Sequence, residues 1–325
     1  MTAMLGEKNQ KVPSDTIFCA DARQMAHLPD SCVHLVVTSP PYNINKTYTD
    51  HQDNLPLDEY LEFLNEVWRE CYRVLVPGGR LCINVANTNR KPYLPLNALI
   101  TSELLRMARE EGLNWLMRGE ILWDKGASAG VSTAWGSFAR SSDPVLRDVH
   151  EYIMVFSKES FKLADGGKSG IRGGQFVDWT RSIWRPEEMM RSHDGGDRGS
   201  GLEELQQKLA GKLKDARRRQ KDDSWIAESM ARAAWQYFSH PGDTVWAMTT
   251  ESGGDHPAPF PVELPRRLIL LYTSAGDLVL DPFMGAGSTA VAAIGTGRHY
   301  VGYDLSQSYC DMANERVKRA SNNQS

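Results

Sequence analysis

The 325-residue chain contains five cysteines, and no two of them form a CxxC pair or show the spacing of metal ligands. This pattern argues against a structural zinc site and against a disulfide framework. No apolar run approaches the length of a membrane span, and the N-terminal residues contain no apolar stretch of signal-peptide length. We therefore expect a cytoplasmic protein that has no metal site and no membrane partner.

The chain also lacks an excess of positive charge, since its formal net charge is −4. The composition alone therefore does not indicate nucleic-acid binding. Basic residues do collect locally, and residues 205–221 contain seven Lys and Arg against one Asp. A run of this kind is most often the solvated face of a helix, so the run alone does not identify a function.

Apolar patterns predict alternating strands and helices in two separate parts of the chain. In the first part, strands are predicted at residues 16–21, 33–42, 80–86, 118–126 and 151–157, and helices at 57–75 and 96–112. In the second part, strands are predicted at 277–281 and 299–304, each followed by a helix. Strands separated by helices indicate an α/β fold with a doubly wound, mostly parallel sheet that is covered on both faces.

The alternation stops between the two parts. Residues 165–201 are rich in Gly and Arg and follow neither a strand nor a helix period, and residues 202–238 are charged and helix-like. We therefore predict one α/β domain in two blocks, residues 14–164 and 246–320, with an inserted module at residues 165–245.

The second block contains a pattern typical of a nucleotide or nucleoside cofactor site. A strand ends at Asp281, a loop with Gly285 and Gly287 follows, and a helix begins at Ser288. The next strand ends at Asp304, where a carboxylate can accept hydrogen bonds from both hydroxyls of a ribose. Glycine in such a loop lets the backbone approach a ligand closely.

Three interpretations of this pattern remain at this point. The loop could be a turn without a ligand, a nicotinamide dinucleotide site, or a site for S-adenosylmethionine. The spacing Gly285-x-Gly287-x-x-Ala290 nearly matches the dinucleotide fingerprint. However, Pro282 removes a backbone N–H that a pyrophosphate would need, which favours S-adenosylmethionine.

The first block has a second distinctive motif, Ser39-Pro40-Pro41-Tyr42, directly after a predicted strand. Two consecutive prolines hold the backbone extended, so the Pro40 carbonyl is fixed and can accept a hydrogen bond. Ser39 adds a second acceptor, and Tyr42 offers an aromatic face. This combination suits a planar amine such as the amino edge of a nucleobase, although a proline-rich turn that caps a strand is the alternative.

TSPPY together with LDPFMGAGST resembles the paired motifs of the DNA amino-methyltransferases, which make N4-methylcytosine and N6-methyladenine. HPAPFPVELPRRLI is similar to a third, cofactor-side motif of that family, and the motif order resembles its permuted β group. WGSFARSSDPVLRDVHEYIMVFSK resembles a stretch common among cytosine-N4 members. The resemblance covers nearly the whole chain except about residues 187–245, and it implies a Rossmann-like methyltransferase sheet with an inserted recognition module.

The resemblance also implies roles for individual residues. The cofactor would be S-adenosylmethionine, and its methionine part would be lined by Asp281, Phe283, Gly285, Gly287 and Ser288. Asp304, where the family more often has glutamate, would hold the ribose. Asp21 would lie near the adenine, and Phe260 and Pro261 would close the cofactor site.

Ser39, Pro40, Pro41 and Tyr42 would form the catalytic motif that holds a flipped base. Hydrogen bonds to Ser39 and to the Pro40 carbonyl would localise the lone pair of cytosine N4, and the methyl group would be transferred in line without a covalent enzyme intermediate. The absence of a Pro-Cys pair argues against methylation of cytosine C5. We expect a structural role for His150 and Glu151, which precede an apolar strand.

The partner implied is double-stranded DNA, and we expect arginines of the inserted module to contact it. These are Arg172, Arg181, Arg185, Arg191, Arg198, Arg217, Arg218 and Arg219. The sequence predicts a site-specific cytosine-N4 DNA methyltransferase. Adenine-N6 methylation, a nicotinamide-dependent dehydrogenase and a non-catalytic nucleic-acid-binding protein are the alternatives. The recognition sequence, a cognate restriction endonuclease and a homodimer are left open.

Overall fold

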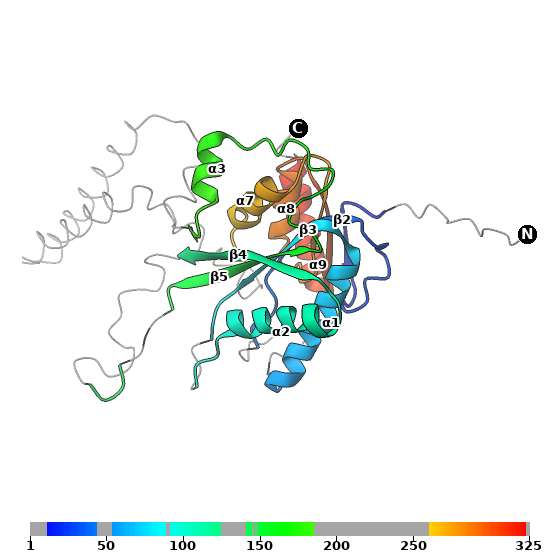
Figure 1. Cartoon of the computed structure of the whole chain (residues 1–325). Helices are drawn as coiled ribbons and strands as arrows, with labels where there is room; N and C mark the ends of the chain where they lie inside the picture. The colour runs from blue at the N-terminus through cyan, green and yellow to red at the C-terminus, as the bar shows by residue number, and fades with distance from the viewer. Residues whose placement is uncertain are drawn as a thin grey trace, which may run out of the picture.

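The computed structural model describes residues 12–43, 54–88, 92–124, 141–144, 146, 148–184 and 260–322. Within them, eight strands form one sheet with the order β1-β8-β7-β2-β3-β5-β4-β6 (Figure 1). The strands are β1 Thr16–Cys19, β2 Val33–Thr38, β3 Leu75–Val85, β4 Trp115–Asp124, β5 His150–Lys158, β6 Ile183–Trp184, β7 Leu278–Asp281 and β8 His299–Asp304. The helices are α1 Leu57–Val74, α2 Leu96–Glu110, α3 Gly173–Trp179, α7 Glu263–Tyr272, α8 Ser288–Ile294 and α9 Gln307–Asn322.

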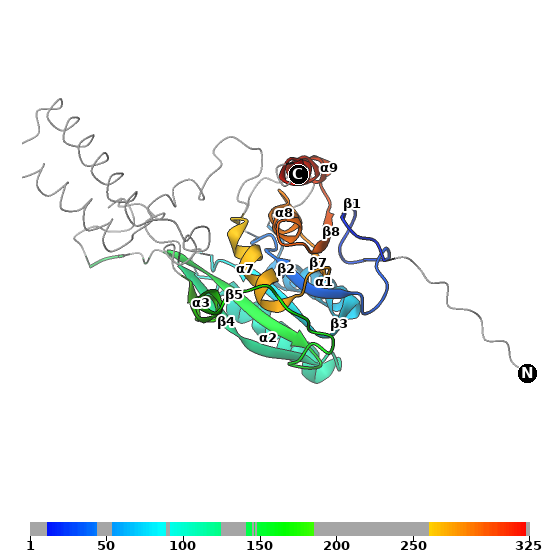
Figure 2. The same cartoon turned by 90° about the horizontal axis from the view of Figure 1, so that it is seen from above.

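The sheet is mostly parallel, because only β5 runs against both of its neighbours, β3 and β4. The two sequence blocks meet at its centre, where β2 of the first block pairs with β7 of the second. Helices α1 and α2 cover one face, and α7, α8 and α9 cover the other (Figure 2). The predicted α/β class and the mostly parallel, two-sided sheet are therefore confirmed.

Helix α1 shows how the sequence pattern produces this layering. Its apolar side chains recur every three or four residues, and Tyr60, Leu64 and Trp68 are at most 1% exposed. The helix ends at Val74 and β3 begins at the next residue, so the strand starts earlier than the sequence predicted and includes Pro77 to Gly79. Gly78 has a φ of +79°, and a Cβ there would lie 2.0 Å from the Lys162 carbonyl oxygen.

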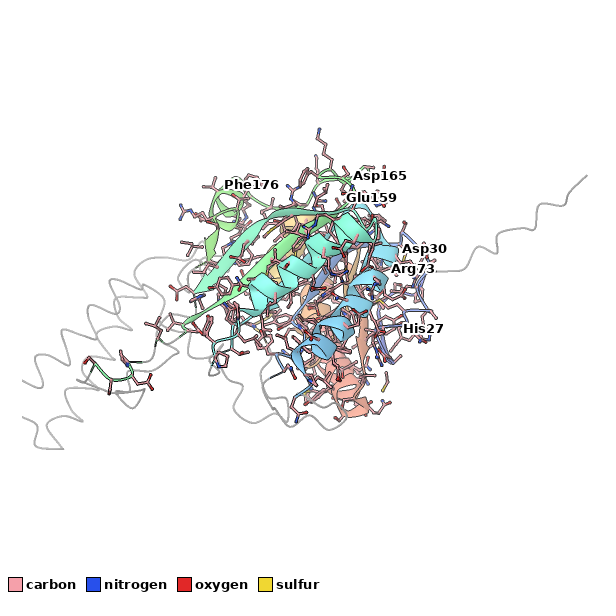
Figure 3. The ribbon with its side chains drawn as sticks, turned by 60° about the horizontal axis from the view of Figure 1, so that its bottom comes forward. His27, Asp30, Arg73, Glu159, Asp165 and Phe176 are labelled. Carbon is pink, nitrogen blue, oxygen red and sulfur yellow. The ribbon has the colours of Figure 1, made fainter. Side chains whose placement is uncertain are left out.

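The loop between β1 and β2 is fixed to the end of α1 by Arg73. Its guanidinium donates to Asp30 at 2.8 Å and to the carbonyls of Leu28 at 2.9 Å and Met25 at 3.0 Å. Figure 3 shows Arg73 and Asp30 beside each other at this end of the helix. These contacts lie at the edge of the sheet where β2 and β3 begin. The candidate site lies at the opposite edge, where these two strands end.

The start of the predicted inserted module belongs to the α/β domain. Within residues 165–184, α3 packs on α7, and β6 extends the sheet in parallel with β4. Trp179 and Trp184 are at most 2% exposed, and the Arg267 guanidinium lies 5.4 and 5.5 Å from their ring centroids. The sequence placed the module boundary at residue 165, whereas the described domain continues to Trp184.

Candidate active site

The predicted motifs meet at one edge of the sheet. Ser39 follows the carboxyl end of β2, Asp281 ends β7 and Asp304 ends β8. Because β5 is antiparallel to β3, its first residues, His150 and Glu151, lie at the same edge. The carboxyl edge of an open α/β sheet is where ligands of such folds bind.

Asp281 is fully buried and is held by hydroxyl groups from both sequence blocks. Its carboxylate accepts hydrogen bonds from Thr38 Oγ1 and Thr289 Oγ1, both at 2.7 Å, and from the Phe283 N–H at 3.1 Å. Burial raises the pKa of Asp281 to about 6 despite these hydrogen bonds. These hydrogen bonds hold the loop in place, and the predicted contact of Asp281 with the methionine part of the cofactor stays a prediction.

The glycine loop after Asp281 is shaped by backbone conformation and close packing. Gly285 and Gly287 have φ values of +50° and +81°, in the left-handed region that favours glycine. A Cβ on Gly287 would lie 2.8 Å from the Ala313 Cβ of α9. The loop is also tied to Asp304, whose carboxylate accepts the Gly285 N–H at 2.8 Å and the Ser306 N–H at 2.9 Å.

Asp21 lies beyond β1, whose last residue pairs in register with Asp304. Arg23 donates its backbone N–H and its guanidinium to the Asp21 carboxylate at 2.7 to 3.1 Å. The same guanidinium lies 5.6 Å from the Phe63 ring centroid, which is 6.0 Å from that of Phe283. Arg23 and Phe63 therefore connect two predicted cofactor residues, and no motif in the sequence pointed to them.

Phe260 and Pro261 lie directly before α7, and both are partly buried. Phe260 packs against the apolar cluster between the sheet and helices α7, α8 and α9. The structure thus places both residues on the same face of the sheet as α8, which follows the glycine loop. Their predicted contact with the cofactor stays a prediction.

These residues fit S-adenosylmethionine. Carboxylates at the ends of two adjacent strands, Asp304 and Asp21, are acceptors of the kind that ribose and adenine groups need. The Ser288 hydroxyl at the end of the glycine loop is buried and has no partner among the described residues, so it can bond to a polar ligand group.

The catalytic motif is fixed by a second set of contacts. Tyr60 donates its hydroxyl to the Pro41 carbonyl at 2.7 Å, whereas no described residue donates to the Pro40 carbonyl. The Ser39 and Tyr42 hydroxyls lie 3.0 Å apart. Burial first, and then the charge of Glu151, raise the pKa of Tyr42 well above its usual value, so the phenol stays protonated.

Glu151, for which the sequence suggested a structural role, lies in this site. Its Oε2 accepts a hydrogen bond from the Tyr42 hydroxyl at 3.2 Å and one from Asn84 Nδ2 at 2.5 Å. Glu151 is 6% exposed and Asn84 2% exposed. A signal was present in the sequence, because Glu151 alternates with the buried Ile153 and Val155 and therefore shares their face of the sheet.

The predicted DNA contacts are only partly within the described residues. Arg172 and Arg181 flank α3 and are exposed, and Arg181 forms an ion pair with Asp178 at 3.6 Å. Arg185, Arg191, Arg198, Arg217, Arg218 and Arg219 lie outside the described residues. A DNA contact by any of these arginines stays a prediction.

Within the described ranges, no cluster of three or more His, Cys, Asp or Glu side chains could hold a metal ion. The helices of those same ranges include none that is long and apolar enough to cross a membrane. All five cysteines are free thiols.

A family model for DNA methylases of the N6 and N4 type matches residues 33–315, and the chain belongs to this family. The type II methyltransferase M.MjaI of Methanocaldococcus jannaschii is 28% identical over 327 residues, which cover 93% of this chain and 90% of that protein. The DNA adenine methyltransferase YhdJ of Escherichia coli is 24% identical over 311 residues, which cover 94% of this chain and 83% of that protein.

Among solved structures, a DNA modification methylase of Thermus thermophilus, TTHA0409, complexed with S-adenosylmethionine, matches with a TM-score of 0.57 and 26% identity. The match covers 94% of this chain and 95% of that one. The protein is therefore a DNA methyltransferase with a Rossmann-like fold and S-adenosylmethionine as its cofactor, as the sequence motifs predicted. These matches exclude the dehydrogenase and the non-catalytic binding protein.

Proposed function

We propose that this protein methylates the exocyclic N4 of cytosine at a specific sequence in double-stranded DNA. The observation that carries the proposal is the pair of acceptors after β2. Ser39 Oγ and the Pro40 carbonyl are adjacent, and the Tyr60 contact to Pro41 holds the turn that presents them. An exocyclic amino group has two N–H donors, which this pair of acceptors matches.

The mechanism follows from the weak nucleophilicity of the amine. Its lone pair is delocalised into the ring, and two N–H···O bonds to Ser39 and Pro40 favour a pyramidal nitrogen with a localised lone pair. S-adenosylmethionine supplies the methyl group as an activated sulfonium. The residues at the ends of β2, β7 and β8 bring amine and cofactor together, so positioning accounts for most of the catalysis. Stacking on Tyr42 would offset part of the cost of flipping the base.

The choice of cytosine over adenine rests on two features of the sequence. Serine before the two prolines and the stretch that ends in HEYIMVFSK both resemble cytosine-N4 members of the family. The hydrogen-bonding argument does not decide, because both amino groups offer the same donors, and the relative YhdJ is an adenine enzyme. Adenine-N6 methylation is therefore the alternative product.

Nucleoside mass spectrometry of DNA from cells that express the protein tests this proposal. We expect N4-methylcytosine, and we expect its loss in cells that express the Ser39→Ala variant at the same level. N6-methyladenine as the only methylated product would refute the choice of base while leaving the enzyme class intact.

We further propose that the segment between Trp184 and residue 245 selects the target sequence. The α/β pattern is interrupted there, and basic residues collect in it. Replacing this segment by that of a relative with another target should redirect methylation without changing cofactor affinity. Retention of the original target would refute the assignment. Substitution of Arg217, Arg218 and Arg219 together should weaken binding to all DNA sequences and flatten its salt dependence, as loss of phosphate contacts does.

The type II relative M.MjaI supports a role in restriction–modification, with a cognate endonuclease as a functional partner. In that role, DNA from expressing cells should resist cleavage by an endonuclease of the same target sequence. Full cleavage of DNA that is shown to be methylated at that site would argue against protection as the function.

A further inference from the structure

We propose that Glu151 orients the hydroxyl of Ser39 through Tyr42, so that the lone pairs of Ser39 face the amino group of the substrate. Glu151 and Tyr42 would then act as positioning residues for methyl transfer. The inference rests on the proposed function only in that Ser39 accepts an N–H of an exocyclic amine. It holds for cytosine and for adenine alike.

The direction of the hydrogen bonds follows from counting protons. Asn84 Nδ2 can only donate, so Glu151 Oε2, at 2.5 Å, is an acceptor. The Tyr42 hydroxyl, 3.2 Å from the same oxygen, therefore donates its single proton to Glu151. In the 3.0 Å contact between Ser39 and Tyr42, the donor is then Ser39. Its only proton points towards Tyr42, and no described residue donates to its lone pairs, which can therefore face the substrate.

The orientation of the Asn84 amide is fixed by the same carboxylate. The reversed amide would place Oδ1 2.5 Å from Glu151 Oε2, where two acceptors would repel each other. The Tyr42 hydroxyl oxygen has two lone pairs, of which the Ala86 backbone takes one and Ser39, at 3.0 Å, takes the other, in preference to Asn84 Nδ2 at 3.3 Å. Asn84 therefore supports the direction of the chain from Ser39 through Tyr42 to Glu151 by its hydrogen bond to the Glu151 carboxylate.

Strand geometry makes this arrangement rigid. Ser39 follows β2, Asn84 lies in β3 and Glu151 lies in β5, and these three strands are neighbours in the sheet. Asn84 pairs in register with Ile153, so Asn84 and Glu151 share one face at the same edge. Both are more than nine-tenths buried. Hydrogen bonds to a charged group in such surroundings are stronger than those between neutral groups.

The arrangement explains how a neutral serine can serve as an amine acceptor. A hydroxyl that donates to a chain ending at a carboxylate becomes a better acceptor, because hydrogen bonds in a chain polarise one another. The negative charge thus lies two hydrogen bonds away from the amine. It polarises Ser39 without a carboxylate having to contact the base.

The test is the single-turnover methylation rate of Glu151→Gln, Ser39→Ala and the double variant. A glutamine at position 151 can donate to Tyr42 and reverse the chain. We expect Glu151→Gln to be slower than the native enzyme by about 10- to 100-fold, the size of one hydrogen bond to a charged group. In the Ser39→Ala background, Glu151→Gln should cause no further loss. Tyr42→Phe should behave in the same way.

Glu159→Gln is a matched control. Glu159 follows the other end of β5 and accepts a hydrogen bond from Tyr72 at 3.2 Å, the same length as the Tyr42–Glu151 bond (Figure 3). This variant loses a similar tyrosine–glutamate contact away from the site, so its methylation rate should equal that of the native enzyme.

A spectroscopic titration gives a readout that does not depend on activity. The absorbance of tyrosinate, taken as the difference between a protein and its Tyr42→Phe variant, reports the ionisation of Tyr42. Removing the charge of Glu151 should lower the Tyr42 pKa in Glu151→Gln, whereas Glu159→Gln should leave it unchanged.

The inference would be overturned if Glu151→Gln lowered the methylation rate by the same factor in the native and Ser39→Ala backgrounds. It would also be overturned if Glu151→Gln left the methylation rate of the native enzyme unchanged. If Glu151→Gln does not fold, Tyr42→Phe in the two backgrounds decides by the same criterion. Failure of the proposed function is a separate result, because it is the identity of the methylated base and not the coupling between residues.

Discussion

The cofactor half and the substrate half of the active site are built in different ways. In the cofactor half, the groups that shape the glycine loop come mainly from one stretch of chain, residues 281–306, and backbone N–H groups supply many of the contacts. In the substrate half, Ser39, Asn84 and Glu151 come from three strands that are far apart in the sequence, and side chains supply the contacts.

This difference determines how easily the residues of each half can be recognised in the sequence. A loop held by its own backbone depends on glycines and on one or two carboxylates, so its residues can be recognised as a motif. A network of side chains depends on the register of neighbouring strands, and its members have no fixed spacing in the sequence. Thr38 links the two halves, because it precedes Ser39 in the chain and donates a hydrogen bond to Asp281.

The largest effect is expected from Ser39→Ala, which removes an amine acceptor from the substrate half. The methylation rate should fall on the order of 100-fold, as when one preorganised hydrogen bond to a reacting group is lost. Cofactor affinity should be unchanged, because the Ser39 hydroxyl is bonded to Tyr42 and has no hydrogen bond to the described residues of the glycine loop. Single-turnover kinetics and calorimetry measure the two quantities. A weaker cofactor affinity would contradict the separation of the two halves.

Asp304→Ala should have the converse effect. The loss of two charge-assisted hydrogen bonds to the ribose should cost on the order of 3 kcal/mol, so the cofactor Kd should rise by at least tenfold. Part of the loss comes from the Gly285 and Ser306 N–H groups, which lose their acceptor. Asp304→Asn, which keeps one acceptor oxygen, is the control and should lose less. Calorimetry that shows an unchanged Kd for Asp304→Ala would refute the assignment of the ribose.

Asp281 should make stability depend on pH. Its pKa is about 6 in the folded protein, whereas an unperturbed carboxyl group of this type has a pKa of 3.8. As the pH falls, the folded state therefore binds a proton at a higher pH than the unfolded state does. The stabilisation of the folded state by this proton is complete below about pH 4 and is lost as the pH rises through about 6. Relative to Asp281→Asn, the free energy of unfolding should therefore fall by about 3 kcal/mol at most between pH 4 and pH 7. Parallel denaturant titrations of the two proteins measure this difference, and a constant difference would contradict the raised pKa.

The smallest effect is expected from the threonines that hold Asp281. Thr38→Val and Thr289→Val each remove one hydrogen bond to the carboxylate and should each lower the free energy of unfolding by about 1 to 2 kcal/mol. Only Thr38 is adjacent to Ser39, so only Thr38→Val should also slow methylation. Equal rates for the two variants would show that Thr38 does not link the halves.

The fold could be predicted because each central element carries a strong local signal. The apolar period of α1 and the short apolar runs of β2 and β7 identified their types, and the motifs identified the ends of the strands that form the site. Elements with few residues gave no such signal. Strand β6 has two residues and α3 has seven, too few for a period to be recognised.

The sequence motifs pointed to several residues of the cofactor half, whereas in the substrate half they pointed only to the proline motif. The partners of Tyr42 are 42 and 109 residues away, at Asn84 and Glu151. Their proximity follows from the pairing of β3 with β5 and from an antiparallel β5, and neither can be deduced from the spacing of residues. The hydrogen bonds of Thr38 and Thr289 to the buried carboxylate of Asp281 were not predicted either: Thr38 comes from a distant strand, and Thr289 lies within the glycine-loop motif, which does not show the direction of its side chain.

The described residues stop at Trp184 and resume at Phe260, and both residues pack into one apolar cluster. The Arg267 guanidinium stabilises the position of Trp184 by its contact with the Trp184 ring. Because both ends are anchored on the same face of the sheet, an exchange of the segment that we propose to select the target, between Trp184 and residue 245, should leave the described strands in place. On that proposal, recombination at the ends of this segment would let descendants of this protein acquire new target sequences while inheriting the methyl-transfer chemistry unaltered.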